Sequence, residues 1–149
     1  MVIDMSVKSE EAAIKAFNLS VRSVMRQAVT VSPSESISNV MFKLVDNDIG
    51  AVVVVEKEEP VGIITEKDVI ERAIMCNKNV YDTIAASIMS KPVISIEADC
   101  SIKEALELMR KHKIRRLAVI GKTGIMAYGA LIGVVTERRV LAGFLSELC

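Results

Sequence analysis

The sequence is poor in the residues that most often mark a catalytic or metal centre. It has one histidine, no tryptophan and three cysteines among its 149 residues. Cys76, Cys100 and Cys149 are odd in number and far apart, with no C-x-x-C pair, which argues against a disulfide framework and a zinc site. We expect reduced cysteines, with Cys76 and Cys100 buried or semi-buried. The lone His112 makes neither a metal site nor a catalytic set.

The chain also lacks a net charge and a long apolar run, and we expect no signal peptide at its start. Its 19 Lys and Arg residues balance 19 Asp and Glu residues, so no overall field gathers nucleic acid or an anionic membrane. Charges run through the first residues, MVIDMSVKSEEAAIKAF, unlike a signal peptide. The longest uncharged run, GIMAYGALIGVV, is too short to span a membrane. We expect a soluble, cytoplasmic protein.

No pattern in the sequence proposes a reaction. A Ser/His/Asp-type set, a Cys/His pair, clustered metal ligands and a Gly-rich phosphate loop are all missing from the sequence. We therefore predict that the chain is not an enzyme and needs no catalytic cofactor or metal.

The sequence contains an internal repeat, in which the same pattern of apolar residues and motifs occurs twice. Apolar residues recur with helical spacing from Ile37 to Val45 and again from Ile102, 65 residues further on. At the same shift, the apolar runs 52–55 and 117–120 predict strands that are buried on both faces. Each run is followed by a similar phrase, GIITEKD at 62–68 and GVVTERR at 133–139.

Each copy is predicted to form strand, helix, strand, strand and helix. The first strands are expected at 29–31 and 93–96, and the second copy has six extra residues within 122–130. A copy of about 55 to 60 residues is too small to bury a sizeable core alone, so the two must pack together. We predict an N-terminal helical segment at 1–19, one repeat at 20–80 and a second repeat at 81–149.

This ordered set of phrases resembles a tandem pair of CBS domains, or Bateman module. The phrases are VRSVM and ASIMSKPV at the entries, IGAVVVV and IRRLAVI after the helices, and GhhT-x-x-[D] at the close, where h is apolar. The resemblance implies an α/β (α+β) fold of two βαββα repeats packed sheet to sheet with pseudo-two-fold symmetry. It also implies a non-catalytic regulatory sensor that binds AMP, ADP, ATP or S-adenosylmethionine between the repeats and acts through a partner protein.

Two interpretations of Asp68 follow from its chemistry. A carboxylate can accept hydrogen bonds from both hydroxyls of a ribose. The spacing Thr65-x-x-Asp68 is equally typical of a helix N-cap with an acid in the first turn. The two roles can coexist.

The basic run RKHKIRR at 110–116 also has two interpretations. Lys and Arg commonly decorate the C-terminal end of a helix, where the dipole favours them. Arg115 and Arg116 instead stand at the entry to a strand, where guanidinium groups can bind phosphate. Nucleic-acid binding through this run is a weaker alternative.

The resemblance assigns these residues to two clefts. The first cleft would contain Thr65, Asp68, Lys91, Pro92, Val93, Ile94, Ile114, Arg115, Arg116 and Leu117. The second would contain Val29, Thr30, Gly50, Ala51, Thr136 and Arg139. Arginine has no acceptor and cannot copy the bonds of Asp68 to a ribose. The second cleft is therefore expected to be empty, filled by Arg139 itself, or adapted to an anion.

The closing helices predict a homodimer, because their apolar residues exceed what one small pair of sheets can cover. These residues are Val69, Ile70, Ala73 and Ile74 in the first repeat and Val140, Leu141, Phe144 and Leu145 in the second. The alternative function is a structural homodimerisation module that binds no small molecule.

Overall fold

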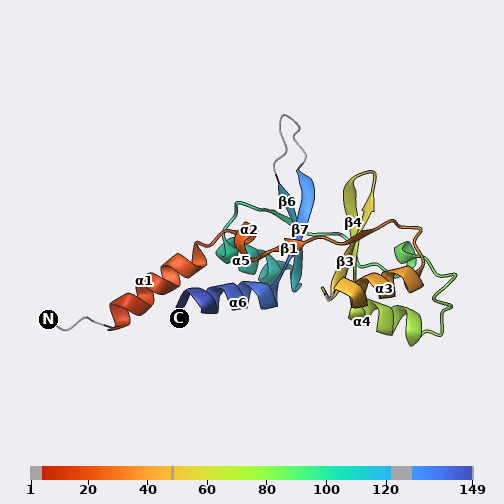
Figure 1. Ribbon diagram of the computed structural model, residues 1–149, viewed down its shortest axis with the longest axis horizontal. Helices are drawn as coiled ribbons and strands as arrows, with labels where there is room; N and C mark the ends of the chain where they lie inside the picture. The colour runs from red at the N-terminus through yellow and green to blue at the C-terminus, as the bar shows by residue number, and fades with distance from the viewer. Residues whose placement is uncertain (1–4, 48, 122–128, 149) are drawn as a thin grey trace. The chain divides into compact units, whose positions relative to one another are not determined.

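The computed structural model describes residues 5–47, 49–121 and 129–148. The chain forms two compact units that do not follow the linear order of the sequence (Figure 1). Unit 1 contains Met1–Arg26 and Ser95–Cys149, and unit 2 contains Gln27–Ile94. Each unit has one small sheet and its own helices, which confirms the mixed α/β fold with two repeats.

Unit 2 is built on a three-stranded sheet in the order β2-β3-β4. Strand β2 (Thr30–Val31) is parallel to β3 (Ala51–Glu56), which is antiparallel to β4 (Glu59–Thr65). Its helices are α3 (Ile37–Asn47), α4 (Glu66–Val69), the π-helix η1 (Ile70–Ile74) and the short 3-10 helix η2 (Ala85–Ser87). The core of this unit consists of Val31, Ile37, Val40, Leu44, Val52, Val54, Ile64, Val69, Ala73, Ala85 and Ile88.

Unit 1 is built on a four-stranded sheet in the order β1-β7-β6-β5. Its strands are β1 (Arg26–Gln27), which ends at the junction of the units, β5 (Ser95–Glu97), β6 (Arg116–Gly121) and β7 (Ala130–Thr136). Its helices are α1 (Met5–Phe17), α2 (Val21–Val24), α5 (Ile102–His112) and α6 (Glu137–Leu148). The end of α1 packs on α6, where the ring centroids of Phe17 and Phe144 lie 4.9 Å apart.

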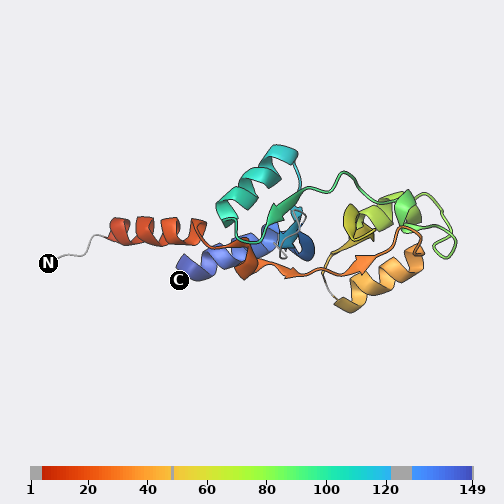
Figure 2. The same ribbon diagram turned by 90° about the horizontal axis from the view of Figure 1, so that it is seen from above.

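Each repeat combines the same helices with the same hairpin. Figure 2 shows α3 and α4 in one unit and α5 and α6 in the other, and the helices of each pair pack against each other. Both hairpins contain a register shift at the same place, after Val54 in β3 and after Val119 in β6. Val52, Val53 and Val54 are all fully buried, as predicted for a strand covered on both faces.

Most predicted elements are confirmed, including the N-terminal helix and both closing helices. Differences occur in short segments: Val93 and Ile94 precede β5 instead of opening it, and α2 and β1 were not predicted. Cys76 is exposed, which contradicts its expected burial, while Cys100 is half-buried. Of the expected insertion within 122–130, residues 122–128 lie outside the described residues. None of the helices that the structure describes is long and apolar enough to cross a membrane.

The apolar residues of the closing helices divide into a buried and an exposed set. Val69, Ala73 and Val140 are buried in their own units, so the expectation that they face outward is wrong. Ile70, Ile74, Leu141 and Leu145 are each about half exposed. A helix places residues i and i+1 on directions about 100° apart, so two adjacent apolar stripes can face different surroundings.

The glycine that opens each GhhT phrase is required by a close approach of the chain. A Cβ on Gly133 would lie 2.7 Å from the backbone oxygen of Arg26 and 2.8 Å from the sulfur of Met25. A Cβ on Gly62 would collide with the side chain of Met89. The segment that enters each repeat in the sequence therefore runs directly over the hairpin of the other repeat.

Replacing these two glycines by alanine should have unequal effects on stability. In Gly133→Ala the Cβ meets a backbone oxygen held in the sheet, whereas in Gly62→Ala it meets a flexible methionine side chain. We expect Gly133→Ala to lower the free energy of unfolding by about 2 to 3 kcal/mol and Gly62→Ala by about 1 kcal/mol. Urea unfolding of both variants measures the difference, and equal losses would contradict this explanation.

The β3–β4 hairpin turns through two residues with positive φ that are not glycine. Lys57 has φ 52° and Glu58 has φ 66°. Both central residues of a type I′ turn need positive φ, and glycine or asparagine adopts it at the lowest cost.

Glycine at the second turn position should therefore stabilise the protein. We expect Glu58→Gly to raise the free energy of unfolding by about 0.5 to 1 kcal/mol, because it removes the steric cost of a left-handed side chain. The control is Glu59→Gly, next along the chain in β4, which should lower stability by about 0.5 to 1 kcal/mol. Thermal unfolding compares them. A destabilised Glu58→Gly variant would show that the turn carries no such strain.

Candidate functional site

The Asp68 carboxylate lies at the junction of β4 and α4 and closes a capping box. The Thr65 hydroxyl accepts a hydrogen bond from the Asp68 N–H at 3.2 Å. In return, Oδ2 of Asp68 accepts from the Thr65 N–H at 2.9 Å and from the Thr65 hydroxyl at 3.1 Å. The cap interpretation of Thr65-x-x-Asp68 is therefore confirmed. Asp68 is the one buried charged residue in the part of the chain that the structure describes.

The other carboxylate oxygen of Asp68 has weaker partners. Oδ1 accepts from the hydroxyl of Ser90 at 3.3 Å and lies 3.8 Å from Nε of Arg72. Ser90 is held against β4 by two backbone hydrogen bonds with Ile63, of 2.8 and 3.0 Å. Sequence analysis missed Ser90 and Arg72. The sequence indicated a contact only for Arg72, which stands one helical turn after Asp68. Nothing in the sequence pointed to Ser90.

The predicted residues Lys91, Pro92, Val93 and Ile94 continue the chain directly from Ser90. The Lys91–Pro92 peptide bond is cis, Lys91 and Pro92 are exposed, and Val93 and Ile94 are half-buried. This segment therefore begins at the carboxylate of Asp68, so the structure brings six of the predicted first-cleft residues to one region of unit 2.

The four remaining first-cleft residues lie in unit 1, at the beginning of β6. Arg116 pairs with Thr136 across the hairpin, and the Arg115 carbonyl accepts from the N–H of Glu137 at 2.9 Å. Arg115 is exposed and Arg116 is half-buried. Among the described residues, Nε of Arg116 is the one buried side-chain nitrogen or oxygen without a hydrogen-bond partner. Ile114 is half-buried and Leu117 lies fully in the core.

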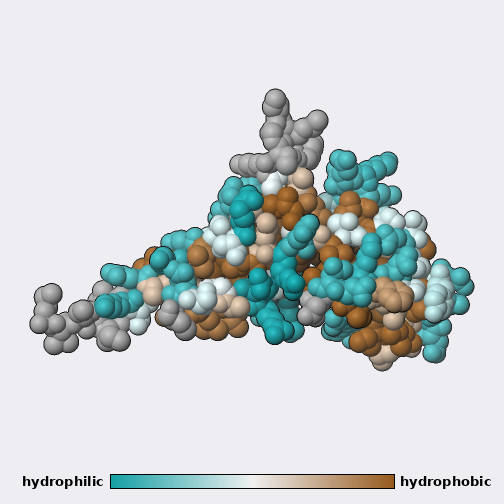
Figure 3. Space-filling model, viewed as in Figure 1, coloured by the Kyte–Doolittle hydropathy of each residue, from teal (hydrophilic) through white to brown (hydrophobic). Residues whose placement is uncertain are grey.

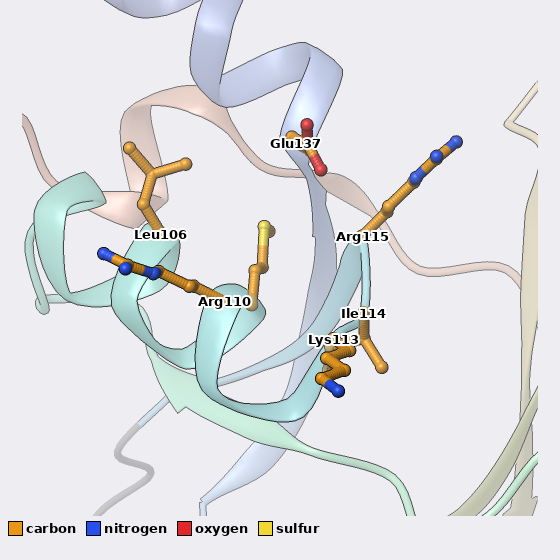
Figure 4. A pocket seen from close by; sticks show the side chains of 7 residues that line it. Leu106, Arg110, Lys113, Ile114, Arg115 and Glu137 are labelled. Carbon is orange, nitrogen blue, oxygen red and sulfur yellow. The ribbon is translucent and has the colours of Figure 1, made fainter.

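A hollow of about 350 Å³ adjoins Arg115 between α5 and α6. It is lined by Leu106, Met109, Arg110, Lys113, Ile114, Arg115 and Glu137. Figure 4 shows Glu137 at the start of α6 and Arg115 directed away from α5. The cations of the lining come from different sides and do not converge, so the hollow by itself is not an anion site.

The second predicted set is also divided between the units. In unit 2, Ala51 pairs with Thr65 across the β3–β4 hairpin, Gly50 has φ 69°, and Thr30 pairs with Val53. The carbonyl of Val29 accepts a hydrogen bond from the N–H of Val53 at 3.0 Å. Residues assigned to both clefts thus occupy the same end of the unit 2 hairpin.

Arg139 completes only half of the cap that Asp68 forms in the first repeat. Its N–H donates to the Thr136 hydroxyl at 3.1 Å, but no carboxylate returns a bond to the Thr136 N–H. Nε of Arg139 instead donates to the carbonyl of Val24, at the end of α2, at 3.5 Å. The Arg139 side chain is therefore directed to the backbone of its own unit.

The structure gives a reason for the arginine at this position. In the first repeat, Arg72 donates to the carbonyls of Ile88 and Met89 at 3.0 and 3.2 Å, in the segment that leads into the second repeat. The residue equivalent to Arg72 in the second repeat is Gly143, where a Cβ would collide with Val24. Because no side chain fits at 143, the guanidinium that caps this carbonyl comes from Arg139. In its side-chain contact, Arg139 corresponds to Arg72 and not to Asp68.

Cys100 is the cysteine of unit 1 that the structure describes, and its thiol lies beside Glu104. Burial raises the pKa of the Cys100 thiol, and its hydrogen bond and charge interaction with Glu104 raise it further. Cys100 is thus a poor nucleophile at neutral pH, because the thiolate is the reactive form. Among the described residues, no group of three or more His, Cys, Asp and Glu side chains could hold a metal ion.

Comparison with known proteins identifies the family. The chain matches the CBS domain over residues 21–74 and 85–146, so it belongs to the CBS domain family as a tandem pair. It is 41% identical over 117 residues to the uncharacterised protein MK0525 of Methanopyrus kandleri, which covers 78% of this chain and 57% of that protein. It is 31% identical over 108 residues to the CBS domain-containing protein YhcV of Bacillus subtilis, with 70% and 76% coverage. The chain thus spans little more than half the length of the Methanopyrus protein.

Solved structures share the fold at low sequence identity. The CBS domain of a bacterial CNNM/CorC family Mg²⁺ transporter, solved in complex with ATP, has a TM-score of 0.75 at 16% identity. That similarity covers 95% of this chain and 98% of the other.

The equivalent residues Asp68 and Arg139 should contribute unequally to stability. Asp68→Ala removes the return half of a capping box and leaves half-buried donors on Thr65 and Ser90 without acceptors. We expect a loss of about 2 to 4 kcal/mol. Arg139→Ala removes one long hydrogen bond of an exposed side chain, and should cost less than about 1 kcal/mol. Denaturant unfolding compares the two variants, and similar losses would contradict the assigned contacts.

Proposed function

We propose that this protein is a regulatory module that binds an adenosine-containing ligand, of the AMP, ADP, ATP or S-adenosylmethionine type, and acts through a partner without catalysis. Three facts support the proposal: membership of the CBS domain family, the ATP complex of a protein with the same fold, and a buried carboxylate at the closing motif of the first repeat. The carboxylate of Asp68 is the observation that carries it.

The proposed ribose acceptor is Oδ1 of Asp68. A carboxylate has about four lone-pair sites, and Oδ2 already accepts two short hydrogen bonds from Thr65. Oδ1 accepts one bond of 3.3 Å, from Ser90, with Arg72 beyond normal hydrogen-bond distance at 3.8 Å. A ribose that donates two hydroxyls must therefore displace Ser90 or share this oxygen with it.

The proposed phosphate-binding residues are Arg115 and Arg116. Guanidinium groups bind phosphate through paired hydrogen bonds, and Arg116 has a buried nitrogen that lacks a partner in unit 1. Lys91, Pro92, Val93 and Ile94 would contact the base or sugar beside Asp68, and Ile114 and Leu117 would support the arginines. Under this proposal the sugar is bound by a residue of the first repeat, and the phosphates are bound by residues of the second.

Calorimetry of Asp68→Asn tests the proposal. Asparagine keeps the size of the side chain but replaces one acceptor by a donor, so affinity for adenosine, AMP, ADP, ATP and S-adenosylmethionine should each fall at least tenfold. The matched control is Ser90→Ala, which frees Oδ1 and should leave affinity unchanged or higher. Equal losses in both variants, with both folded by thermal unfolding, would show that binding needs only an intact junction.

The same titrations test the arginines. Arg115→Ala and Arg116→Ala should weaken ATP and AMP while adenosine binding stays unchanged, whereas Lys111→Ala on the neighbouring helix should affect none of them. Equal loss for adenosine would make the arginines structural. No binding of any of these ligands at millimolar concentration would overturn the proposal.

One observation favours the alternative, a structural homodimerisation module without a ligand. The Asp68 carboxylate already has protein partners on both oxygens, so the cap alone accounts for an acid at this position. Absence of binding in the titrations above, together with a stable dimer, would establish this alternative.

A further inference from the structure

A groove of about 370 Å³ runs along α5 of unit 1, on the side next to β5. It is lined by Ile96, Cys100, Glu104, Glu107, Leu108 and Lys111. Ile96 is buried and Leu108 is half-buried, whereas the two glutamates and the lysine are exposed. The groove therefore has an apolar floor and a charged rim, and its volume is typical of small-molecule sites, which have about 300 to 1,000 Å³. Figure 3 shows a surface of another kind over α4 of unit 2, where hydrophobic residues gather.

The first repeat fills the equivalent place with a side chain of its own. Residues 65 positions apart are equivalent, as the pairing of β2 with β3 and of β5 with β6 confirms. The Lys43 ammonium, on α3, donates to the carbonyl of Thr30 in β2 at 2.9 Å and lies 3.4 Å from Oε2 of Glu35. An aliphatic chain that ends in an ammonium group thus joins this helix to the edge strand of its sheet.

The second repeat has lost this ammonium and gained acids around its place. Leu108 stands where the first repeat has Lys43, and Cys100 stands where it has the paired carboxylate. Glu104 and Glu107 replace an asparagine and a phenylalanine of the first repeat. Leucine cannot join α5 to β5 by a hydrogen bond, so the groove keeps the apolar floor without the cation.

Both glutamates have acceptor sites for a cation. Oε2 of Glu104 accepts from the Ser101 N–H at 2.9 Å, and the Cys100 thiol forms a hydrogen bond with the same carboxylate. A carboxylate has about four acceptor sites, so further bonds to Glu104 are available. The Glu107 side chain has no ion pair or hydrogen bond within the residues that the structure describes. After burial, which is the largest cause, the interactions with Glu104 raise the pKa of the Cys100 thiol, as a negative field at the groove would.

We propose that this groove binds a free aliphatic diamine. One ammonium group pairs with Glu104 and the other with Glu107, while the methylene chain lies on Ile96 and Leu108 as a replacement for the lysine stem of the first repeat. Residues 104 and 107 are about 4.5 Å apart along the helix axis, a spacing that suits two ammonium groups on a short chain. The probe is 1,4-diaminobutane, which has as many methylene groups as a lysine side chain. This inference does not depend on the proposed adenosine ligand.

Lys111 limits the length and charge of the ligand. It stands one turn after Glu107, lines the same groove and forms no ion pair among the described residues. A third ammonium group beyond Glu107 would meet the ammonium of Lys111, and like charges repel. We therefore expect a diamine to bind more tightly than the triamine spermidine. Non-specific attraction to an acidic surface would give the opposite order, because it grows with the charge of the ligand.

An NMR titration of the full chain tests this proposal at about 0.15 M salt, where exposed charges are screened. With 1,4-diaminobutane at up to about 10 mM, the amide signals of residues 96–111 should shift and saturate, and spermidine should bind more weakly. Leu108→Lys should abolish binding, because it returns the lysine of the first repeat to the groove. Lys111→Gln should strengthen spermidine more than the diamine.

The exposed Glu107→Gln variant removes one proposed ion pair without disturbing the core, and should weaken 1,4-diaminobutane at least fivefold. The matched control is Glu10→Gln on α1, which removes the same charge from an exposed position of unit 1 outside the groove and should leave binding unchanged. Circular dichroism checks that each variant is folded. Absence of binding at about 10 mM, tighter binding of spermidine than of the diamine, or equal losses in Glu107→Gln and Glu10→Gln would each overturn the proposal.

Discussion

The carboxylate of Asp68 is the interaction on which the candidate site of unit 2 depends. It joins the start of α4, through Thr65, to the segment that enters the second repeat, through Ser90. Arg72 extends the connection by donating to the carbonyls of Ile88 and Met89. A buried charge is tolerated only when hydrogen bonds replace its water, and here those bonds link two segments that are distant in sequence, 65–72 and 88–90.

In each repeat an arginine donates to a backbone carbonyl, but the arginine stands at a different position, and this explains why the repeats diverge. Both run an entering segment closely over the glycine of the GhhT phrase, and both present a backbone carbonyl that a guanidinium caps. Arg72 can do this in the first repeat, which leaves position 68 free for an acid. Val24 closes the equivalent space at Gly143, so position 139 supplies the guanidinium instead. Packing thus decides which repeat can keep a carboxylate at the strand-to-helix junction.

Local patterns in the sequence predicted local structure well. The helix cap predicted from the spacing Thr65-x-x-Asp68 is present as a capping box, and Ser101 forms a second box with the same spacing to Glu104. The contact of Asp68 with Ser90 could not be predicted, because Ser90 reaches it only through its backbone bridge with Ile63. Periodicity also could not tell Val69 from Ile70, since both belong to apolar stripes of one helix and only packing decides which is buried.

The contacts of Asp68 also indicate how the proposed ligand could act on a partner. A ligand shifts a conformational equilibrium only through different interactions with the two states. Ribose hydroxyls and Ser90 would compete for one carboxylate oxygen, so binding would weaken the bond that ties the entering segment to α4. That segment leads directly into the second repeat, through Lys91 and Pro92. Under the proposed function, the ligand and the bond that holds this segment to α4 would therefore depend on the same carboxylate.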